Sequence, residues 1–253
     1  MQVHLEVTAD DAKNAAKRGD VTIIIDVLRA SSTIVTALSN GARQVIPTLT
    51  LHEARRISRT IPRCILGGER KGLRPKDFTV GNSPPEYERT LVDGRTVVLT
   101  TTSGTRALVK ALGSKLILVG SFLNGKAVAE AAHRIAESTG TDVTLVASGK
   151  ESALSFEDLL CAGQISEHLN SLGASVVDGC AIVALSWKSA QENLWRSIWY
   201  STHAQYLKSI GFERDVEFCI RVDSSDIVPV LRKKALVPLT DLGRLSQIPS
   251  RSR

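Results

Sequence analysis

The segment from Val21 to Thr33 constrains the fold of this chain more than any other stretch. Its first five residues, Val-Thr-Ile-Ile-Ile, are all β-branched, which is typical of a strand buried inside a parallel sheet. Asp26 ends the run, and Arg29 is followed by Ser31, Ser32 and Thr33 at the start of a helix predicted over residues 33–39. An acid at this position can ligate a metal or act as a nucleophile, and a helix N-terminus attracts phosphate. The alternative is purely structural, with Asp26 in a turn and a serine capping the helix.

Similar strands recur over the first two thirds of the chain and alternate with helices. Strands are predicted near residues 3–8, 21–26, 43–47, 64–68, 96–101, 115–120 and 142–147, and most are followed by an amphipathic or capped helix. This alternation predicts an α/β fold of three layers, αβα, with a largely parallel or mixed sheet. Residues 71–88 are rich in proline and glycine, so we expect an irregular and functional loop there.

The pattern is less regular after residue 175. Trp195, Ile198 and Trp199 are spaced to form one apolar helical face, which favours a core or subunit contact. Later strands are expected over Asp215–Val222 and Val228–Val237. Because no low-complexity linker interrupts the chain, we expect one domain over residues 1–253. Two lobes that share one site, the second from about residue 150 onward, are the alternative.

Composition and charge narrow the class of protein. The four cysteines are scattered without a C-x-x-C pair, and no segment resembles a signal peptide or a membrane span, so we expect a cytoplasmic protein. The net charge of +6 suits nucleic acid or small anions. Aromatic residues are only 4% of the chain, which leaves few rings to stack on bases. Basic residues gather only in short runs, at 55–56, 232–234 and 251–253. We therefore expect a small anionic ligand, with neither nucleic acid nor membrane as a partner.

Four strand-to-helix junctions carry similar polar residues. They are Asp26 to Thr33, Gly67-Gly68-Glu69-Arg70, Thr100 to Arg106, and Gly120-Ser121-Phe122-Leu123-Asn124. Helix capping explains any one of them alone. In a parallel sheet, however, all four lie at the carboxyl edge, where ligands bind, and together they favour an anion site with acids at its rim.

Carboxylates and arginines at these junctions suggest a metal and an anion clamp. Asp26, Glu69 and one of Glu157 and Asp158 form an oxygen-ligand set of the kind that Mg²⁺ uses. The N-terminal position of Glu157 and Asp158 in a helix is also explained by the helix dipole. Arg29, Arg70 and Arg106 are the expected anion clamps.

Several common enzyme classes are excluded by their missing motifs. The chain has no G-x-x-x-x-G-K-[ST], no G-x-S-x-G and no H-E-x-x-H. Most histidines are expected at the surface or in satisfied core positions, and His203 is the one considered as a group that reaches the site from the C-terminal part.

The motifs together resemble the 2-phosphosulfolactate phosphatase family. They are Asp26-Val-Leu-Arg-Ala-Ser-Ser-Thr33, Leu66-Gly-Gly-Glu-Arg70, Gly81-Asn-Ser-Pro84 with Glu86-Tyr87, Thr101-Thr-Ser-Gly-Thr-Arg106-Ala-Leu108, Gly120-Ser-Phe-Leu-Asn124, and Ser155-Phe-Glu-Asp158 with Cys161-Ala-Gly163. They span residues 20–240 in the family's order. Two positions depart from the pattern: Ser103 stands where Asn is expected, and Ala204 stands where Gly is expected after His203.

The resemblance implies a Mg²⁺-dependent phosphatase that hydrolyses 2-phospho-3-sulfolactate to sulfolactate and phosphate, a step towards coenzyme M. Our own inference from these residues assigns catalysis to Asp26, Arg29, Glu69 and Arg106, and Mg²⁺ binding to Asp26, Glu69, Glu157 and Asp158. The expected substrate-binding residues are Ser31, Ser32, Thr33, Arg70, Asn82, Ser83, Thr102, Gly104, Thr105, Ser121 and Asn124.

Three other interpretations stay open at this point. The first is a haloacid-dehalogenase-type phosphatase with Asp26 as nucleophile, although Leu28 stands where such enzymes carry a second aspartate. The second is a non-catalytic protein that binds anions or nucleic acid without a metal. The third keeps the fold and Mg²⁺ but acts on another 2-phospho-hydroxy acid. A homo-oligomer is compatible with all of them.

Overall fold

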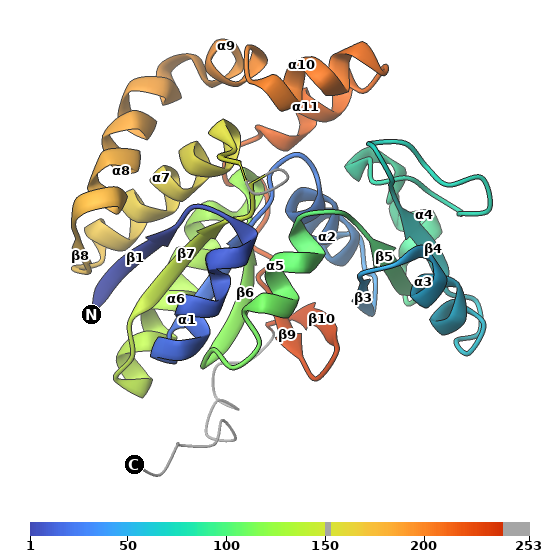
Figure 1. Cartoon of the computed structure of the whole chain (residues 1–253), viewed down its shortest axis with the longest axis horizontal. Helices are drawn as coiled ribbons and strands as arrows, with labels where there is room; N and C mark the ends of the chain where they lie inside the picture. Colours follow the sequence, from blue (N-terminus) through green and yellow to red (C-terminus); the bar gives the residue numbers. More distant parts are fainter. Residues whose placement is uncertain (150–152, 240–253) are drawn as a thin grey trace.

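The computed structural model describes residues 1–149 and 153–239, and the basic residues at 251–253 lie outside this part. A central sheet lies between helical layers (Figure 1), as the sequence predicts. The strands are β1 (Gln2–Glu6), β2 (Val21–Ile25), β3 (Gln44–Thr48), β4 (Ile65–Gly68), β5 (Thr96–Thr100), β6 (Leu116–Gly120), β7 (Val143–Ala147), β8 (Ser175–Val176), β9 (Pro229–Arg232) and β10 (Ala235–Pro238).

Helices connect most of these strands. Up to β8 they are α1 (Ala12–Arg18), α2 (Ala30–Ser39), α3 (Leu51–Ser58), α4 (Arg89–Val92), α5 (Gly104–Lys110), α6 (Gly125–Thr139) and α7 (Phe156–Ser171). The C-terminal arm is the name used here for the four helices that follow β8, which form an arch along the upper side of Figure 1: α8 (Asp178–Ala190), α9 (Leu194–Trp199), α10 (Thr202–Ser209) and α11 (Glu213–Cys219). None of the described helices is long and apolar enough to cross a bilayer.

The sheet is mixed, with the order β4-β5-β3-β10-β9-β6-β2-β7-β1-β8. A short parallel group (β4, β5, β3) and a long parallel group (β6, β2, β7, β1, β8) are joined by the antiparallel hairpin β9–β10. One residue pair joins the hairpin to each group, Val45 with Leu236 and Leu118 with Val230. The hairpin confirms the strands expected over Val228–Val237.

The two parallel groups run in opposite directions, because three antiparallel pairings separate β3 from β6. The mixed sheet confirms one of the two forms predicted from the sequence, but the single carboxyl edge that was expected to bring the four junctions together is wrong. Adjacent strands twist by about 20–25°, so the five pairings from β2 to β5 accumulate about 100–125°. The residues that follow β2, β4 and β5 line one cavity despite the reversal.

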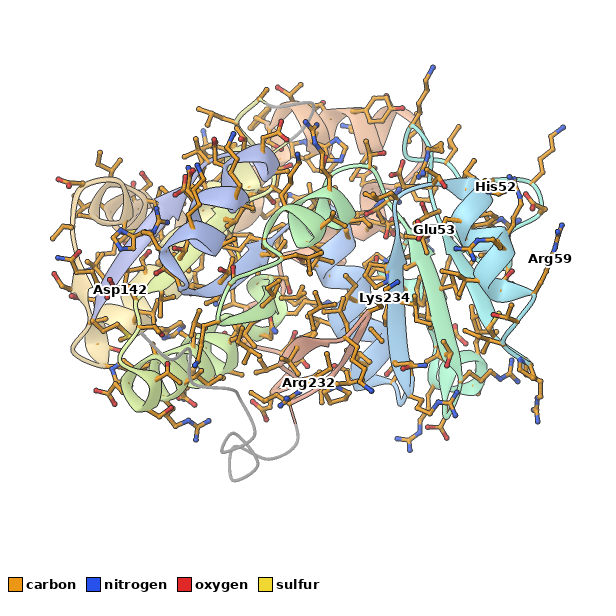
Figure 2. All side chains as sticks on the ribbon, turned by 60° about the horizontal axis from the view of Figure 1, so that its bottom comes forward. His52, Glu53, Arg59, Asp142, Arg232 and Lys234 are labelled. Carbon is orange, nitrogen blue, oxygen red and sulfur yellow. The ribbon has the colours of Figure 1, made fainter. Side chains whose placement is uncertain are left out.

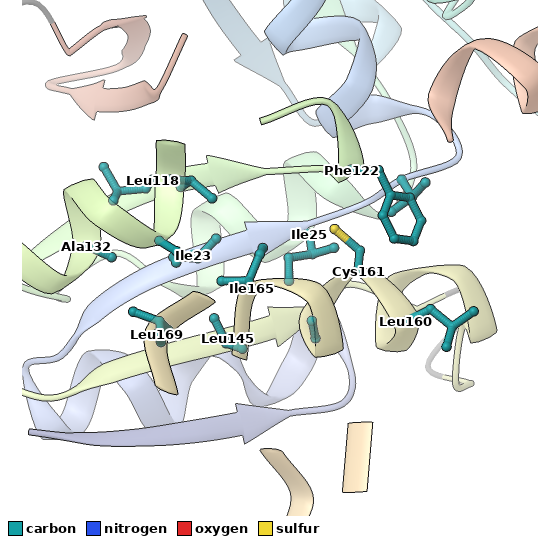
Figure 3. Packing of buried hydrophobic residues seen from close by; sticks show 14 of the residues in the cluster. Ile23, Ile25, Leu118, Phe122, Ala132, Leu145, Leu160, Cys161, Ile165 and Leu169 are labelled. Carbon is teal, nitrogen blue, oxygen red and sulfur yellow. The ribbon is translucent and has the colours of Figure 1, made fainter. Parts of the chain in front are cut away.

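Side chains of β2 alternate between two cores, as the period of two in a strand requires. Ile23 and Ile25 pack with Leu145, Ile165 and the other residues of the α6–α7 side (Figure 3). Ile24 belongs to the second cluster, which includes residues of α1, α2 and α5 on the opposite face. All five residues of β2 are buried, so the strand that leads to Asp26 is fixed from both sides.

Two segments differ from the sequence prediction. Residues 215–222 were expected to form a strand, but 213–219 are helix α11, in which the buried Asp215, Val216 and Cys219 follow helical spacing. Helix α2 begins at Ala30, three residues earlier than expected, because the Asp26 carboxylate accepts from its first N–H at 3.1 Å. The helix predicted for Trp195, Ile198 and Trp199 is confirmed as α9; Ile198 is buried and Trp195 packs against the core.

Basic residues are spread over the surface (Figure 2). Arg59 projects near α3, while Arg232 and Lys234 lie at the hairpin, well away from it. Arg55 forms an ion pair with the exposed Asp77, which neutralises part of the positive charge on the α3 face. The distribution agrees with the absence of a dense basic run in the sequence.

Candidate functional site

A cavity of about 460 Å³ lies where the residues after β2, β4, β5 and β7 meet the C-terminal arm. Its lining includes eight residues selected from the sequence: Asp26, Arg29, Glu69, Arg70, Asn82, Thr102, Glu157 and Asp158. Convergence of these distant segments is therefore confirmed as a geometric fact, while their chemical roles stay predictions.

Asp26 is held at the end of β2 by the backbone around it. Its Oδ1 accepts from Ala30 N–H at 3.1 Å, and its own N–H donates to the Ser31 hydroxyl at 2.9 Å. A Cβ added to Gly104 would lie 3.0 Å from Asp26 Oδ2 and 2.8 Å from Ala30 Cβ. Gly104 therefore brings the start of α5 closer to the carboxylate than any larger residue could.

Three hydrogen bonds fix Asp158 at the N-terminus of α7. Its Oδ1 accepts from Val27 N–H at 2.8 Å, and its Oδ2 accepts from Gly149 N–H at 3.2 Å. Its own N–H donates to the hydroxyl of Ser155, which caps the helix as the sequence predicts. Glu157 is also buried and lines the cavity. The first turn of α7 thus brings two acids towards Asp26.

Glu69 organises the loop after β4. Its Oε1 accepts from the N–H and the hydroxyl of Thr102, at 3.0 and 2.8 Å, and its Oε2 accepts from Gly72 N–H at 2.8 Å. One carboxylate therefore ties the β4 and β5 junctions together.

The buried acids repel one another. Burial and, after it, the charges of Glu69 and Glu157 raise the pKa of Asp26 to about 6, against the opposing effect of the N–H groups of Ala30 and Gly104. Burial, followed by the charges of Asp26 and Glu157, also holds the pKa of Asp158 well above its usual range. A bound cation would relieve this repulsion.

The donor set suits Mg²⁺ in part. Asp26, Glu69, Glu157 and Asp158 supply the oxygen atoms that this hard cation prefers. Across residues 1–149 and 153–239, no three His, Cys, Asp or Glu side chains are close enough to form a ready ligand cluster. The arrangement therefore fits a Mg²⁺ that takes one or two carboxylates and completes its shell with water and a substrate phosphate.

Arg29 lines the cavity but is almost completely buried, with 3% of its surface exposed. Its Nη1 donates to Asp215 at 2.5 Å, its Nη2 donates to the Gly72 carbonyl at 2.6 Å, and its guanidinium lies 4.3 Å from the centre of the Phe212 ring. Three partners therefore fix the orientation of this cation.

Arg70 is bound mainly by its own surroundings. It donates to the carbonyls of Glu69 and Leu49 and to the Thr100 hydroxyl. The next residue, Lys71, also lines the cavity and is exposed. Lys71 and Gly72 have φ values of 51° and 73° in a turn closed by hydrogen bonds between Arg70 and Leu73. A lysine in the left-handed region is uncommon and is held there by this turn.

Several predicted substrate contacts lie outside the cavity lining. The hydroxyls of Ser31, Ser32 and Thr33 bond to backbone carbonyls within the fold. Ser83 donates to Asp215, and Thr105 bonds to the Thr101 hydroxyl. These side chains lie outside the cavity, and their hydrogen bonds stabilise its walls.

The β6 junction and Arg106 are also displaced from the cavity. Ser121 and Asn124 form a capping box, and Asn124 also donates to the carbonyls of Val119 and Ile227. Arg106 is exposed and pairs with Asp10 on the outer side of α5. The structure therefore gives Arg106 a surface ion pair and leaves the cavity to Arg29, Arg70 and Lys71.

His203 reaches the cavity from α10, together with Tyr206. The two rings are stacked with centroids 6.0 Å apart. The sequence considered His203 for this position, and its placement there is confirmed.

Comparison with known proteins gives a consistent result. The family model described as 2-phosphosulpholactate phosphatase matches residues 7–234. The chain belongs to the 2-phosphosulfolactate phosphatase family. Similar curated proteins named probable 2-phosphosulfolactate phosphatase occur in Pseudothermotoga lettingae (42% identity, 83% of this chain and 88% of the relative) and Clostridium beijerinckii (34% identity, 90% and 96%).

Several residues at the site were not predicted from the sequence. Asp215 bonds to Arg29, while Gly72 and Tyr206 line the cavity. The sequence predicted a strand around Asp215 and an irregular loop around Gly72, and it predicted no element around Tyr206. Of the two departures from the family pattern, Ser103 lines the cavity, whereas Ala204 is buried in α10. Only the Ser103 departure changes a surface that a ligand can touch.

Proposed function

We propose that this protein is a Mg²⁺-dependent phosphatase that hydrolyses 2-phospho-3-sulfolactate to 3-sulfolactate and phosphate. The observation that carries the proposal is the convergence of buried acids and of cationic side chains on one cavity, in a member of this family. A substrate with a phosphate, a sulfonate and a carboxylate needs both kinds of group, one to hold a metal and the other to balance the anions.

Asp26 and Glu157 are the acids best placed to contact a cation, and Asp158 and Glu69 support them. Asp158 holds Val27 and Gly149, and Glu69 holds Thr102 and Gly72, so their carboxylates orient the backbone that surrounds the ion. Bound Mg²⁺ would polarise the phosphoryl group and favour attack by water.

The cationic side chains have separate tasks in this proposal. Arg29 presents a fixed guanidinium to the phosphoryl oxygens, because its orientation is set by three partners. Lys71, on the rim, balances the sulfonate or carboxylate at the other end of the substrate. The Ser103 hydroxyl also lines the cavity and can donate to the anion.

The first experiment measures phosphate release from 2-phospho-3-sulfolactate and from 2-phospholactate, with Mg²⁺ and with EDTA. We expect fast, Mg²⁺-dependent release from the sulfonated substrate and its loss in Asp26→Asn. Equal rates on both substrates would favour a phosphatase of other 2-phospho-hydroxy acids. No release from either by folded protein would contradict the proposed activity.

Trapping experiments separate the remaining alternatives. A phosphorylated Asp26, isolated after rapid quenching, would revive the haloacid-dehalogenase-type mechanism, whereas direct attack by water leaves no adduct. Salt-dependent nucleic-acid binding that is indifferent to EDTA would favour the non-catalytic protein. A place on the route to coenzyme M, a cytoplasmic location and a homo-oligomeric state stay predictions.

A further inference from the structure

The C-terminal arm reaches the back of the cavity through one buried acid. Asp215, in α11, is 3% exposed and does not line the cavity. Its Oδ2 accepts from Arg29 Nη1 at 2.5 Å, and its Oδ1 accepts from the Ser83 hydroxyl at 2.7 Å. Both oxygens of the carboxylate are therefore used, one by a residue of the cavity wall and one by the loop beside it.

The same arm holds the loop that carries Lys71 and Gly72. The Tyr206 hydroxyl donates to the Lys71 carbonyl at 2.9 Å. A Cβ added to Gly72 would lie 2.7 Å from Ile210 Cδ1, so the arm packs directly on this glycine. Arg29 Nη2 donates to the carbonyl of Gly72, which links that loop back to Asp215 through the guanidinium.

These contacts connect α11 to the cavity through the Arg29 guanidinium. We propose that Asp215 is a positioning residue of this phosphatase: it fixes the plane of the Arg29 guanidinium, so that the N–H groups left over from its protein partners face the phosphoryl group. This inference rests on the proposed function. Arginine suits the role because its planar, always charged fork binds a carboxylate on one side and a phosphate on another.

A buried arginine needs such a partner. Without Asp215, Arg29 keeps its contacts with Gly72 and Phe212, but neither supplies a negative charge. The guanidinium is then free to rotate about its long side chain, and a misplacement of about 1 Å in a catalytic group lowers the rate by about 100-fold. The expected effect is therefore on kcat, with a much smaller effect on KM.

The test is a double-mutant cycle on phosphate release with saturating Mg²⁺. The variants are Asp215→Asn, Asp215→Glu, Ser83→Ala, Arg29→Lys and the double variant Arg29→Lys with Asp215→Asn. Glu217→Gln is the matched control, because Glu217 is an exposed acid on the same helix. Thermal unfolding is recorded for each variant.

We expect Asp215→Asn to lower kcat by about 100-fold with KM changed less than threefold, and Asp215→Glu to recover at least tenfold. The double variant should have the kcat of Arg29→Lys within threefold, because Asp215 acts only through Arg29. Glu217→Gln should match the wild type. A folded Asp215→Asn protein with wild-type kcat, or losses that multiply in the double variant, would overturn the inference.

Two further measurements keep the test decisive. If Asp215→Asn does not fold, Ser83→Ala carries the test, since it removes one hydrogen bond to Asp215 and keeps the negative charge; wild-type kcat in folded Ser83→Ala then overturns the inference. If the wild type releases no phosphate from any substrate, the proposed function has failed. The pair is then tested by calorimetry with orthovanadate, a transition-state analogue of phosphoryl transfer, and a Kd that changes less than threefold in Asp215→Asn counts against it.

Discussion

The Oδ1 atom of Asp158 accepts a hydrogen bond of 2.8 Å from the backbone N–H of Val27, the residue that follows Asp26. An acid at the start of α7 thus fixes the backbone next to an acid at the end of β2, although 131 positions separate Asp158 from Val27. Its other oxygen holds Gly149 at the end of β7. Asp158 therefore joins three segments of the cavity wall: the start of α7, the residues after β2 and the residues after β7.

Asp158→Asn should weaken Mg²⁺ binding. The amide keeps one acceptor but turns a donor towards Val27 or Gly149, so one backbone N–H loses its partner. Outer-shell changes of this kind cost about 10–100-fold in metal affinity. Titration of activity against Mg²⁺ measures the change, and Glu137→Gln, at an exposed site of α6, should leave it unaltered. An unchanged Mg²⁺ requirement in Asp158→Asn would contradict the supporting role.

Stability should depend on pH in the metal-free protein. The pKa of Asp26 is raised from 3.8 to about 6, so the folded state binds more protons than the unfolded state between these values. The free energy of unfolding should therefore fall as pH rises from about 4 through about 6. Urea unfolding in EDTA measures this slope, and Asp26→Asn should flatten it. With Mg²⁺ present the slope should shrink, because the cation favours the ionised carboxylates. A slope of opposite sign would contradict the burial of these acids.

Gly104→Ala should damage the site more than the fold. The new methyl would lie 3.0 Å from Asp26 Oδ2 and 2.8 Å from Ala30 Cβ, so the start of α5 has to move. Overpacking typically costs about 1–3 kcal/mol, and the displaced Asp26 should lower kcat by at least about tenfold. Gly179→Ala is the control, because its methyl would meet only Leu5 at ordinary contact distance. Equal kcat for the two variants would show that Asp26 tolerates the shift.

Much of this fold could be predicted from the sequence. β-branched runs located the central strands, and the Ser155 cap located the start of α7, since both signals are local. Helix α11 was missed because Asp215 and Val216 belong to a short segment whose helical spacing covers only two turns. The reversal between the two sheet groups depends on the hairpin pairing, and no local pattern encodes the partner of a strand.

The candidate site, like the fold, could be predicted from the sequence only in part. Asp26, Glu69, Glu157 and Asp158 were found because acids at strand and helix ends are visible in a sequence. Whether a hydroxyl faces a cavity or a carbonyl is decided by packing, and for that reason Ser32 and Thr33 lie within the wall. The surface ion pair of Arg106 likewise requires the position of Asp10, 96 residues away.

Leu236→Ala should destabilise the whole molecule. Leu236 is completely buried and lies at the one residue pair that joins β10 to β3. Removing a buried leucine side chain costs about 2–5 kcal/mol. Chemical denaturation measures the loss, and Leu112→Ala, at an exposed position, should cost little. A loss below 1 kcal/mol for Leu236→Ala would mean that the hairpin contributes little to sheet stability.

The position of that hairpin sets an order of events during synthesis. Asp26 belongs to the long group of strands and Glu69 to the short one, and the strands that connect the two groups are formed by residues 229–238. A ribosome that has made the first 220 residues has therefore exposed every acid of the cavity without the strands that bring the two groups into one sheet. The nascent chain can form its local helices and parallel units early, but catalytic competence arrives only after β10 has left the exit tunnel.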